Sequence, residues 1–221
     1  MLFDLRSRGR RRTVQVIYSI LALVMLGGLV LFGVGAGNGI GGLLNAFTNN
    51  ASNSNHQAID QQTRSAMRAT RLHPNSAHSW AALVQARWSA AGTGSNYNTT
   101  TQTYTNSGKV QLRAAVHAWE RYRALSTTPS AGVATLAARA YSTLSDWGGA
   151  ATAWEYVANA EPTAPSPFVC LAATAYAAKQ TRKGDLAAAQ AVSLAPKLQR
   201  LQLKQELTAA KTSTTLAQGC G

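Results

Sequence analysis

The sequence has little charge and few of the residues that build chemical sites. Charged residues make up 13% of the 221 residues, about half the share of an average soluble protein. The chain has two cysteines and four scattered histidines, which argues against a structural zinc site or a disulfide-built miniprotein. It has no phosphate-binding P-loop, G-x-S-x-G elbow or H-E-x-x-H motif, and its acids lack paired spacing for acid–base catalysis. We therefore predict a protein that is not an enzyme and uses no cofactor or metal.

Charge is almost missing from the stretch between Arg12 and Arg64, where Asp60 is the only charged residue. Residues 1–12 carry five arginines, and residues 13–36 are almost wholly apolar. About 20 apolar residues in a helix span the hydrocarbon core of a bilayer. The arginines predict a basic cytoplasmic tail (1–12), a single-pass transmembrane helix (13–36) in the cytoplasmic membrane, and an extracytoplasmic remainder.

Two other interpretations of this region stay open. A cleaved signal peptide would end near Gly35–Gly37, although signal peptides usually have a shorter apolar core of about 7–15 residues. Gly33, Gly37 and Gly41 have the spacing that lets transmembrane helices pack closely, which permits a homo-oligomer. An exposed turn over residues 37–42, past the end of the helix, is the favoured interpretation of the later glycines. Residues 37–56, rich in Asn and Ser beyond a short apolar patch, are predicted to be a flexible linker.

Prolines recur at a repeat period. Pro74, Pro129, Pro162 and Pro196 each follow an Ala- and Leu-rich stretch with helical spacing, at intervals of 55, 33 and 34 residues. Proline commonly stands just past the end of a helix. The pattern predicts an all-α domain over residues 57–211, in which the longer first interval holds a polar insertion (93–108). This insertion is interpreted as a mobile spacer or as a binding loop.

The best-matched unit carries small and aromatic residues at regular places: Ala138, Tyr141, Trp147, Ala150, Trp154, Val157 and Pro162. It resembles the tetratricopeptide repeat (TPR), which has small residues at unit positions 8, 20 and 27, aromatics at 11, 17 and 24, and proline at 32. The unit that ends at Pro196 matches more loosely. The resemblance implies a TPR-like α-solenoid of about three helix pairs.

The expected ends of the helices and of the domain follow from local signals. Candidate N-caps are Ser76, Ser130, Ser166 and Asp146. Residues 197–211 are predicted to be a capping helix with an apolar face of Leu198, Leu201 and Leu203, and residues 212–221 a disordered tail. Cys170 and Cys220 either form a disulfide or remain a buried thiol and an exposed tail thiol, and the second interpretation is favoured.

In TPR proteins the first helix of each unit lines a concave groove that binds a peptide. The resemblance assigns the following residues to that groove: His78, Gln85, Trp88, Thr135, Arg139, Ser142, Thr143 and Tyr176. The Lys and Asn that grip a partner's terminal carboxylate in some relatives are absent here, because the matching positions hold Ala81 and Gln85 in the first unit.

The resulting functional hypothesis is a membrane-anchored TPR adaptor or scaffold that binds a protein or peptide on the extracytoplasmic side of the membrane. The alternatives are a chaperone-like subunit near the protein secretion channel and a binder of anionic cell-envelope polymer or lipid. The last alternative follows from the excess of 16 Lys and Arg over 7 acids beyond residue 12, since a basic surface attracts anionic partners. A nucleic-acid partner is not expected, because the predicted topology turns the domain away from the cytoplasm.

Overall fold

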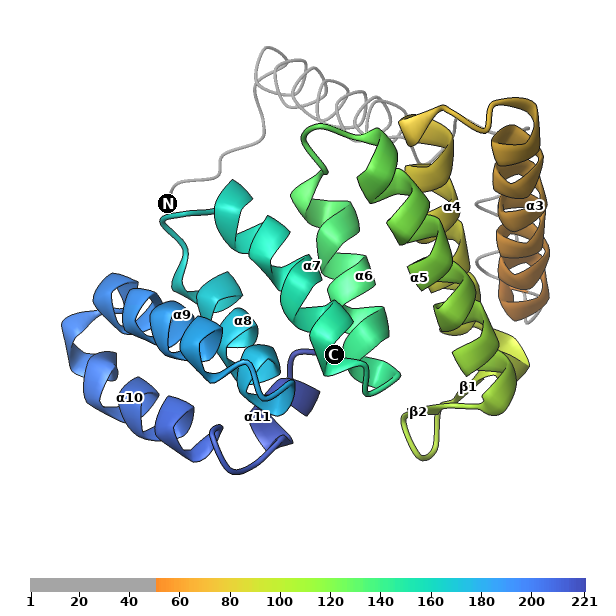
Figure 1. Ribbon diagram of the computed structural model, residues 1–221. Coiled ribbons are helices and arrows are strands. Elements are labelled where there is room, and N and C mark those ends of the chain that lie inside the picture. Colours follow the sequence, from red (N-terminus) through yellow and green to blue (C-terminus); the bar gives the residue numbers. More distant parts are fainter. Residues whose placement is uncertain (1–50) are drawn as a thin grey trace, which may run out of the picture. The chain divides into compact units, whose positions relative to one another are not determined.

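The structure is a computed structural model that describes residues 51–221, with side chains from His56 onward. The helices are α3 (Ala51–Leu72), α4 (Ala77–Ala91), α5 (Asn106–Leu125), α6 (Ala131–Thr143), α7 (Trp147–Ala160), α8 (Pro165–Ala177), α9 (Thr181–Leu194), α10 (Arg200–Ala209) and α11 (Thr215–Gln218) (Figure 1). Two 3₁₀ turns, η1 (Gly94–Asn96) and η2 (Lys197–Gln199), and two strands, β1 (Tyr97–Asn98) and β2 (Thr103–Tyr104), complete the described chain.

The predicted basic tail, the predicted transmembrane helix and most of the predicted linker lie outside the described residues. Across residues 51–221, no helix is both long enough and apolar enough to cross a membrane. A compact unit begins at His56, one residue before the predicted start of the domain. Helix α3 nevertheless begins at Ala51, inside the predicted linker. No glycine or proline interrupts residues 51–72, so the two strongest helix breakers are absent from the start of α3, although its Ser and Asn residues favour a linker.

The unit His56–Gly221 is mostly helical, in agreement with the predicted all-α class, and its helices pack in chain order. Helices α4 and α5, α6 and α7, and α8 and α9 form three pairs, and each pair also contacts the next (Figure 1). The prolines follow helix ends as predicted: Pro162 comes two residues after α7, and Pro196 two residues after α9. A continuous core of Ala, Leu, Val and aromatic side chains runs through all three pairs.

The helix starts agree with the capping signals in most cases. The Ser76 hydroxyl accepts a hydrogen bond from Ser79 N (3.3 Å), and the Asp146 carboxylate accepts one from Gly149 N (3.0 Å). Ser130 occupies the N-cap of α6 without a side-chain bond. The prediction for Ser166 was wrong, because α8 begins at Pro165 with Ala164 as its N-cap. The fixed φ of proline suits the first helical position.

The polar insertion is a small folded element. Residues 97–98 and 103–104 form an antiparallel hairpin in which Tyr97 pairs with Tyr104. Thr105 caps α5, which starts at Asn106 and so takes in the last residues of the predicted insertion. Gly108 in the first turn of α5 lies against the Asn96 carbonyl, where an added Cβ would overlap the oxygen. This contact fixes the base of the hairpin against α5.

The C-terminal region differs from the prediction at two points. In the capping helix, Leu207 is buried and Leu203 half-buried, whereas Leu198 and Leu201 are exposed. Leu198 lies in η2, before α10 begins, and positions 203 and 207 share one face of a helix. Residues 212–221 are not a disordered tail, because they contain α11 and end beside Cys220, which is bonded to Cys170.

Two neighbouring glycines in α7 give a matched test of how tightly this helix packs on α6. A Cβ at Gly149 would overlap the ring of Tyr141, whereas a Cβ at Gly148 would lie 3.8 Å from its nearest neighbour. Gly149→Ala is expected to lower the free energy of unfolding by about 1–3 kcal/mol through overpacking. Gly148→Ala is expected to raise it by up to about 1 kcal/mol, because alanine favours the helix. Denaturant unfolding of both variants checks the pair, and equal effects would contradict the close approach.

Candidate functional site

A pocket of about 550 Å³ lies where the first two helix pairs, the hairpin and the C-terminal segment meet. It is lined by Trp88, Tyr97, Gln102, Thr103, Tyr104, Lys109, Arg139, Thr143, Gln218 and Gly221. Three of these residues, Trp88, Arg139 and Thr143, belong to the predicted groove. The structure therefore brings together part of the predicted set and adds residues from the insertion and the C-terminus.

Three aromatic side chains form one wall of the pocket. The Tyr104 ring lies between the other two, with its centroid 6.4 Å from that of Trp88 and 5.1 Å from that of Tyr97. Burial, with a smaller contribution from Tyr97, raises the pKa of Tyr104, and nearby Arg139 acts in the opposite direction. The phenol therefore stays neutral at physiological pH. The pocket thus offers apolar ring surface next to hydroxyl groups.

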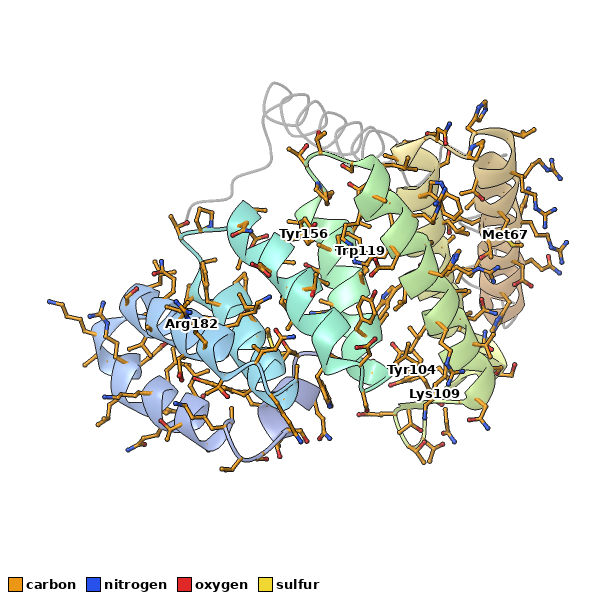
Figure 2. The ribbon with its side chains drawn as sticks, viewed as in Figure 1. Met67, Tyr104, Lys109, Trp119, Tyr156 and Arg182 are labelled. Carbon is orange, nitrogen blue, oxygen red and sulfur yellow. A yellow bond between two sulfur atoms is a disulfide. The ribbon has the colours of Figure 1, made fainter. Side chains whose placement is uncertain are left out.

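Two cations line the same pocket. Lys109 lies in the first turn of α5, beside Tyr104 (Figure 2), and Arg139 is exposed on α6. No aspartate or glutamate lines this pocket. Across residues 51–221 the ion pairs join Arg123 to Glu120, Lys183 to Glu155 and Lys211 to Asp185. Neither pocket cation takes part in them, so both charges are free to pair with an anionic ligand.

The other predicted groove residues lie outside this pocket. His78 and Gln85 are exposed on α4, and the half-buried Thr135 donates its hydroxyl hydrogen bond to the Ala131 carbonyl (2.9 Å) within α6. Ser142 is only 4% exposed and Tyr176 only 7%. The prediction that Ser142 and Tyr176 line an accessible groove is therefore wrong.

Tyr176 is buried because it packs between the two helices of its own pair. Its ring lies against Gly184, where an added Cβ would come 2.5 Å from ring carbons, and its hydroxyl donates to Asp185 (2.9 Å). Burial and this bond to Asp185 raise the pKa of Tyr176. Lys211 covers the ring at 5.4 Å and pairs with Asp185 at 2.7 Å. The cluster joins α8, α9 and the end of α10.

The C-terminal segment, Thr215–Gly221, covers the surface shared by α6 and α8. Helix α11 contacts both of these helices. The disulfide from Cys220 to Cys170 fixes the segment to α8, with the two Cα atoms 5.6 Å apart. Gly221 lies against α6, where an added Cβ would be 3.5 Å from the Ser142 Cβ. The expected free thiols are therefore absent, and this part of the predicted groove is occupied by the chain itself.

The titratable clusters outside the pocket hold helices together. Glu120 on α5 accepts hydrogen bonds from Tyr141 on α6 and from Arg123. Burial acts to raise the pKa of Glu120, but these two donors and the Arg123 charge outweigh it, so the pKa is lowered. Within residues 51–221, no three His, Cys, Asp or Glu side chains lie close enough together to hold a metal ion.

The residues that sequence reasoning did not assign to the site are Tyr97, Gln102, Thr103, Tyr104, Lys109, Gln218 and Gly221. The available signal is the pair of tyrosines in an otherwise polar insertion, for which a binding loop is one of the two predictions. No protein-family model matches the sequence, and no curated protein matches it either.

Proposed function

We propose that this protein is a membrane-anchored, TPR-like adaptor that binds a segment of a partner protein on the extracytoplasmic side of the membrane. The observation that carries the proposal is the pocket between α4, α6 and the hairpin. It combines half-buried aromatic rings with two cations, Lys109 and Arg139, that take part in none of the ion pairs of residues 51–221, on a stack of helix pairs. Aromatic and arginine side chains in a concave surface are typical anchors for a protein ligand.

The repeat geometry supports the TPR-like part of the proposal. Ser145 and Lys179 lie in the turns within two successive pairs, 34 residues apart, and both have a left-handed backbone with φ of 60°. The small residues at the matching places of the second unit, Ala138 and Ala150, are fully buried. Each pair leaves an apolar face that its neighbour covers, as in solenoid proteins.

The disulfide supports an extracytoplasmic location. Cys170 and Cys220 are bonded, and structural disulfides persist mainly in oxidising compartments outside the cytoplasm. The arginine-rich start and the apolar run 13–36 lead to the same topology through the positive-inside rule. The two lines of argument are independent, since one rests on side-chain pairing and the other on charge asymmetry.

The test is photo-crosslinking in living cells with a photoreactive residue at Thr143 or Thr103, which both line the pocket. These positions leave Lys109 and Arg139 intact. We expect one dominant protein adduct at each position, lost when Trp88 and Tyr104 are replaced by alanine. The matched control is the same residue at Ser193, exposed on α9 and outside the pocket, where the adduct should be absent.

The other outcomes each exclude the dedicated adaptor. A broad set of newly exported proteins together with channel subunits would identify the secretion-side helper instead. No protein adduct at either pocket position, with an expressed and folded variant, would reject protein binding at this surface and leave the anionic polymer or lipid binder.

A further inference from the structure

The charge of the pocket restricts the chemistry of its ligand. Lys109 and Arg139 line the pocket, no aspartate or glutamate side chain lines it, and neither cation takes part in the ion pairs of residues 51–221. A cationic segment would meet like charges there, whereas a segment with carboxylates would form two new pairs. Electrostatic complementarity of this kind chiefly sets specificity and the association rate.

The aromatic wall favours a polypeptide over an anionic polymer. Trp88, Tyr97 and Tyr104 present ring surface within the same pocket as the two cations. A chain of phosphates has no apolar groups to cover these rings, so binding it would leave them in water. A peptide with an aromatic or aliphatic side chain next to a carboxylate would use both parts of the pocket.

The C-terminal segment limits the length of that ligand. Thr215–Gly221 occupies the surface between α6 and α8, and Gln218 and Gly221 form an edge of the pocket. The remaining volume of about 550 Å³ lies within the range of roughly 300–1,000 Å³ found for pockets that enclose small ligands. Such a volume accommodates a few residues rather than a long helix.

We propose that the pocket recognises a short acidic segment of a partner protein, whose carboxylates pair with Lys109 and Arg139 while an aromatic side chain packs on Trp88 and Tyr104. This inference rests on the proposed adaptor function, because it names the partner class for the same site. It specifies three properties of the ligand: a negative charge, an aromatic side chain and a short length. Each of these properties can be tested separately.

The experiment uses the purified full chain in a neutral detergent and a short fluorescent peptide of alternating glutamate and tyrosine. The comparison peptide carries glutamine in place of each glutamate. We expect the acidic peptide to bind about tenfold more tightly at low salt, because two partly exposed ion pairs contribute modestly each. The difference should shrink as ionic strength rises. Equal affinity for the two peptides at low salt would overturn the proposal.

Charge reversal provides the residue-level test. Lys109→Glu combined with Arg139→Glu is expected to abolish the preference for the acidic peptide and to favour a peptide of alternating lysine and tyrosine. The matched control reverses two exposed cations outside the pocket, Lys197→Glu with Lys204→Glu, and should leave the preference nearly unchanged. If both double variants lose the preference for the acidic peptide equally, the preference depends only on the net charge of the protein, and the proposal is wrong.

A third variant separates the peptide from an anionic polymer. Trp88→Ala should weaken both the acidic and the glutamine peptide, since it removes ring surface without changing charge. If inorganic polyphosphate displaces the acidic peptide as efficiently as unlabelled peptide does, and Trp88→Ala has no effect, the site is a polyanion site and the proposal is wrong.

A protein adduct in cells without acid preference in vitro would support the adaptor function and reject the acidic segment. Acid preference in vitro without any adduct in cells would reject the adaptor and the partner segment together, and would leave only a pocket that prefers anionic ligands.

Discussion

Replacing Cys220 with serine is expected to lower the free energy of unfolding by about 2–4 kcal/mol. The disulfide joins residues separated by 50 positions, so the closed loop contains α9, α10 and most of the C-terminal segment. A crosslink over a loop of this length removes many conformations from the unfolded chain. Denaturant unfolding of the full chain in neutral detergent measures the change.

The matched variants are Cys170→Ser and the double replacement. Because one bond is lost in each case, all three variants should lose a similar amount of stability rather than additive amounts. A thiol reductant should produce the same loss in the native sequence and no further loss in the variants. A native sequence that is insensitive to reductant while the serine variants are destabilised would assign the effect to packing of the sulfur atoms instead.

Without the disulfide, local unfolding should increase most in the C-terminal segment, Thr215–Gly221. Without the bond, α11 retains only the burial of Ala217, the partial burial of Leu216 and its contacts with α6 and α8. Trypsin cleavage after Lys211 should therefore accelerate more than cleavage after Arg123 in α5. In cells, rapid thiol trapping should find the two cysteines oxidised, and free thiols there would contradict the extracytoplasmic location.

The parts of the fold that could be predicted depend on local signals. Prolines past helix ends, Ser76 and Asp146 as N-caps, and small residues at helix crossings act within one turn or one helix pair. They were sufficient to predict an all-α domain that begins near residue 57. The disulfide was not predictable in the same way, because its two residues lie 50 positions apart and meet only after the chain has passed through α9 and α10.

The error at Tyr176 has a specific cause. Counted back from the prolines, Tyr141 lies at unit position 11 and Tyr176 at position 12, which assigned the second ring to the groove. In the structure each ring packs on the glycine eight residues later, Tyr141 on Gly149 and Tyr176 on Gly184. The aromatic residue and its glycine have shifted together by one position. The spacing of eight between tyrosine and glycine is therefore the signal that would have assigned Tyr176 to the core.

The pocket was predictable only in part because it combines segments of different origin. Trp88 and Arg139 come from the repeat pattern, whereas Tyr97 and Tyr104 come from an insertion that has no counterpart in the other units. Lys109, a cation that lines the same pocket, lies in the first turn of α5, the helix that directly follows the hairpin. No periodicity within the repeats could have indicated its position.

Trp119→Ala is expected to cost about 3–5 kcal/mol, the largest effect of a single side chain in the described part of the protein. Trp119 on α5 is fully buried, and its ring centroid lies 5.7 Å from Tyr122 and 5.6 Å from Tyr156 on α7 (Figure 2). The side chain thus joins the first helix pair to the second. Removing it would leave a cavity at that interface that the surrounding alanines cannot fill.

A conservative replacement of Trp119 distinguishes the cost of the cavity from the effect of losing the indole N–H group. Within residues 51–221, the buried Nε1 of Trp119 has no hydrogen-bond partner, so Trp119→Phe loses no bond and removes an unsatisfied donor. It should cost less than half as much as Trp119→Ala. The matched control is Trp80→Ala, since Trp80 is half-buried and donates its Nε1 to the Pro74 carbonyl at 2.7 Å. A cost for Trp80→Ala equal to that of Trp119→Ala would contradict the central role of Trp119.

Trp119→Ala should also weaken peptide binding in the pocket, because the two helices that line the pocket belong to different pairs. Trp88 lies on α4 in the first pair and Arg139 on α6 in the second. In a stacked array each pair is stabilised mainly by its neighbours, so a cavity at the Trp119 interface should loosen α4 and α5 before α8 and α9. Hydrogen exchange should then be faster in α4 and α5, and the acidic peptide should bind more weakly under conditions where the chain is still folded. If binding is unchanged while exchange rises, the hairpin contacts alone hold Trp88 and Tyr104 in position.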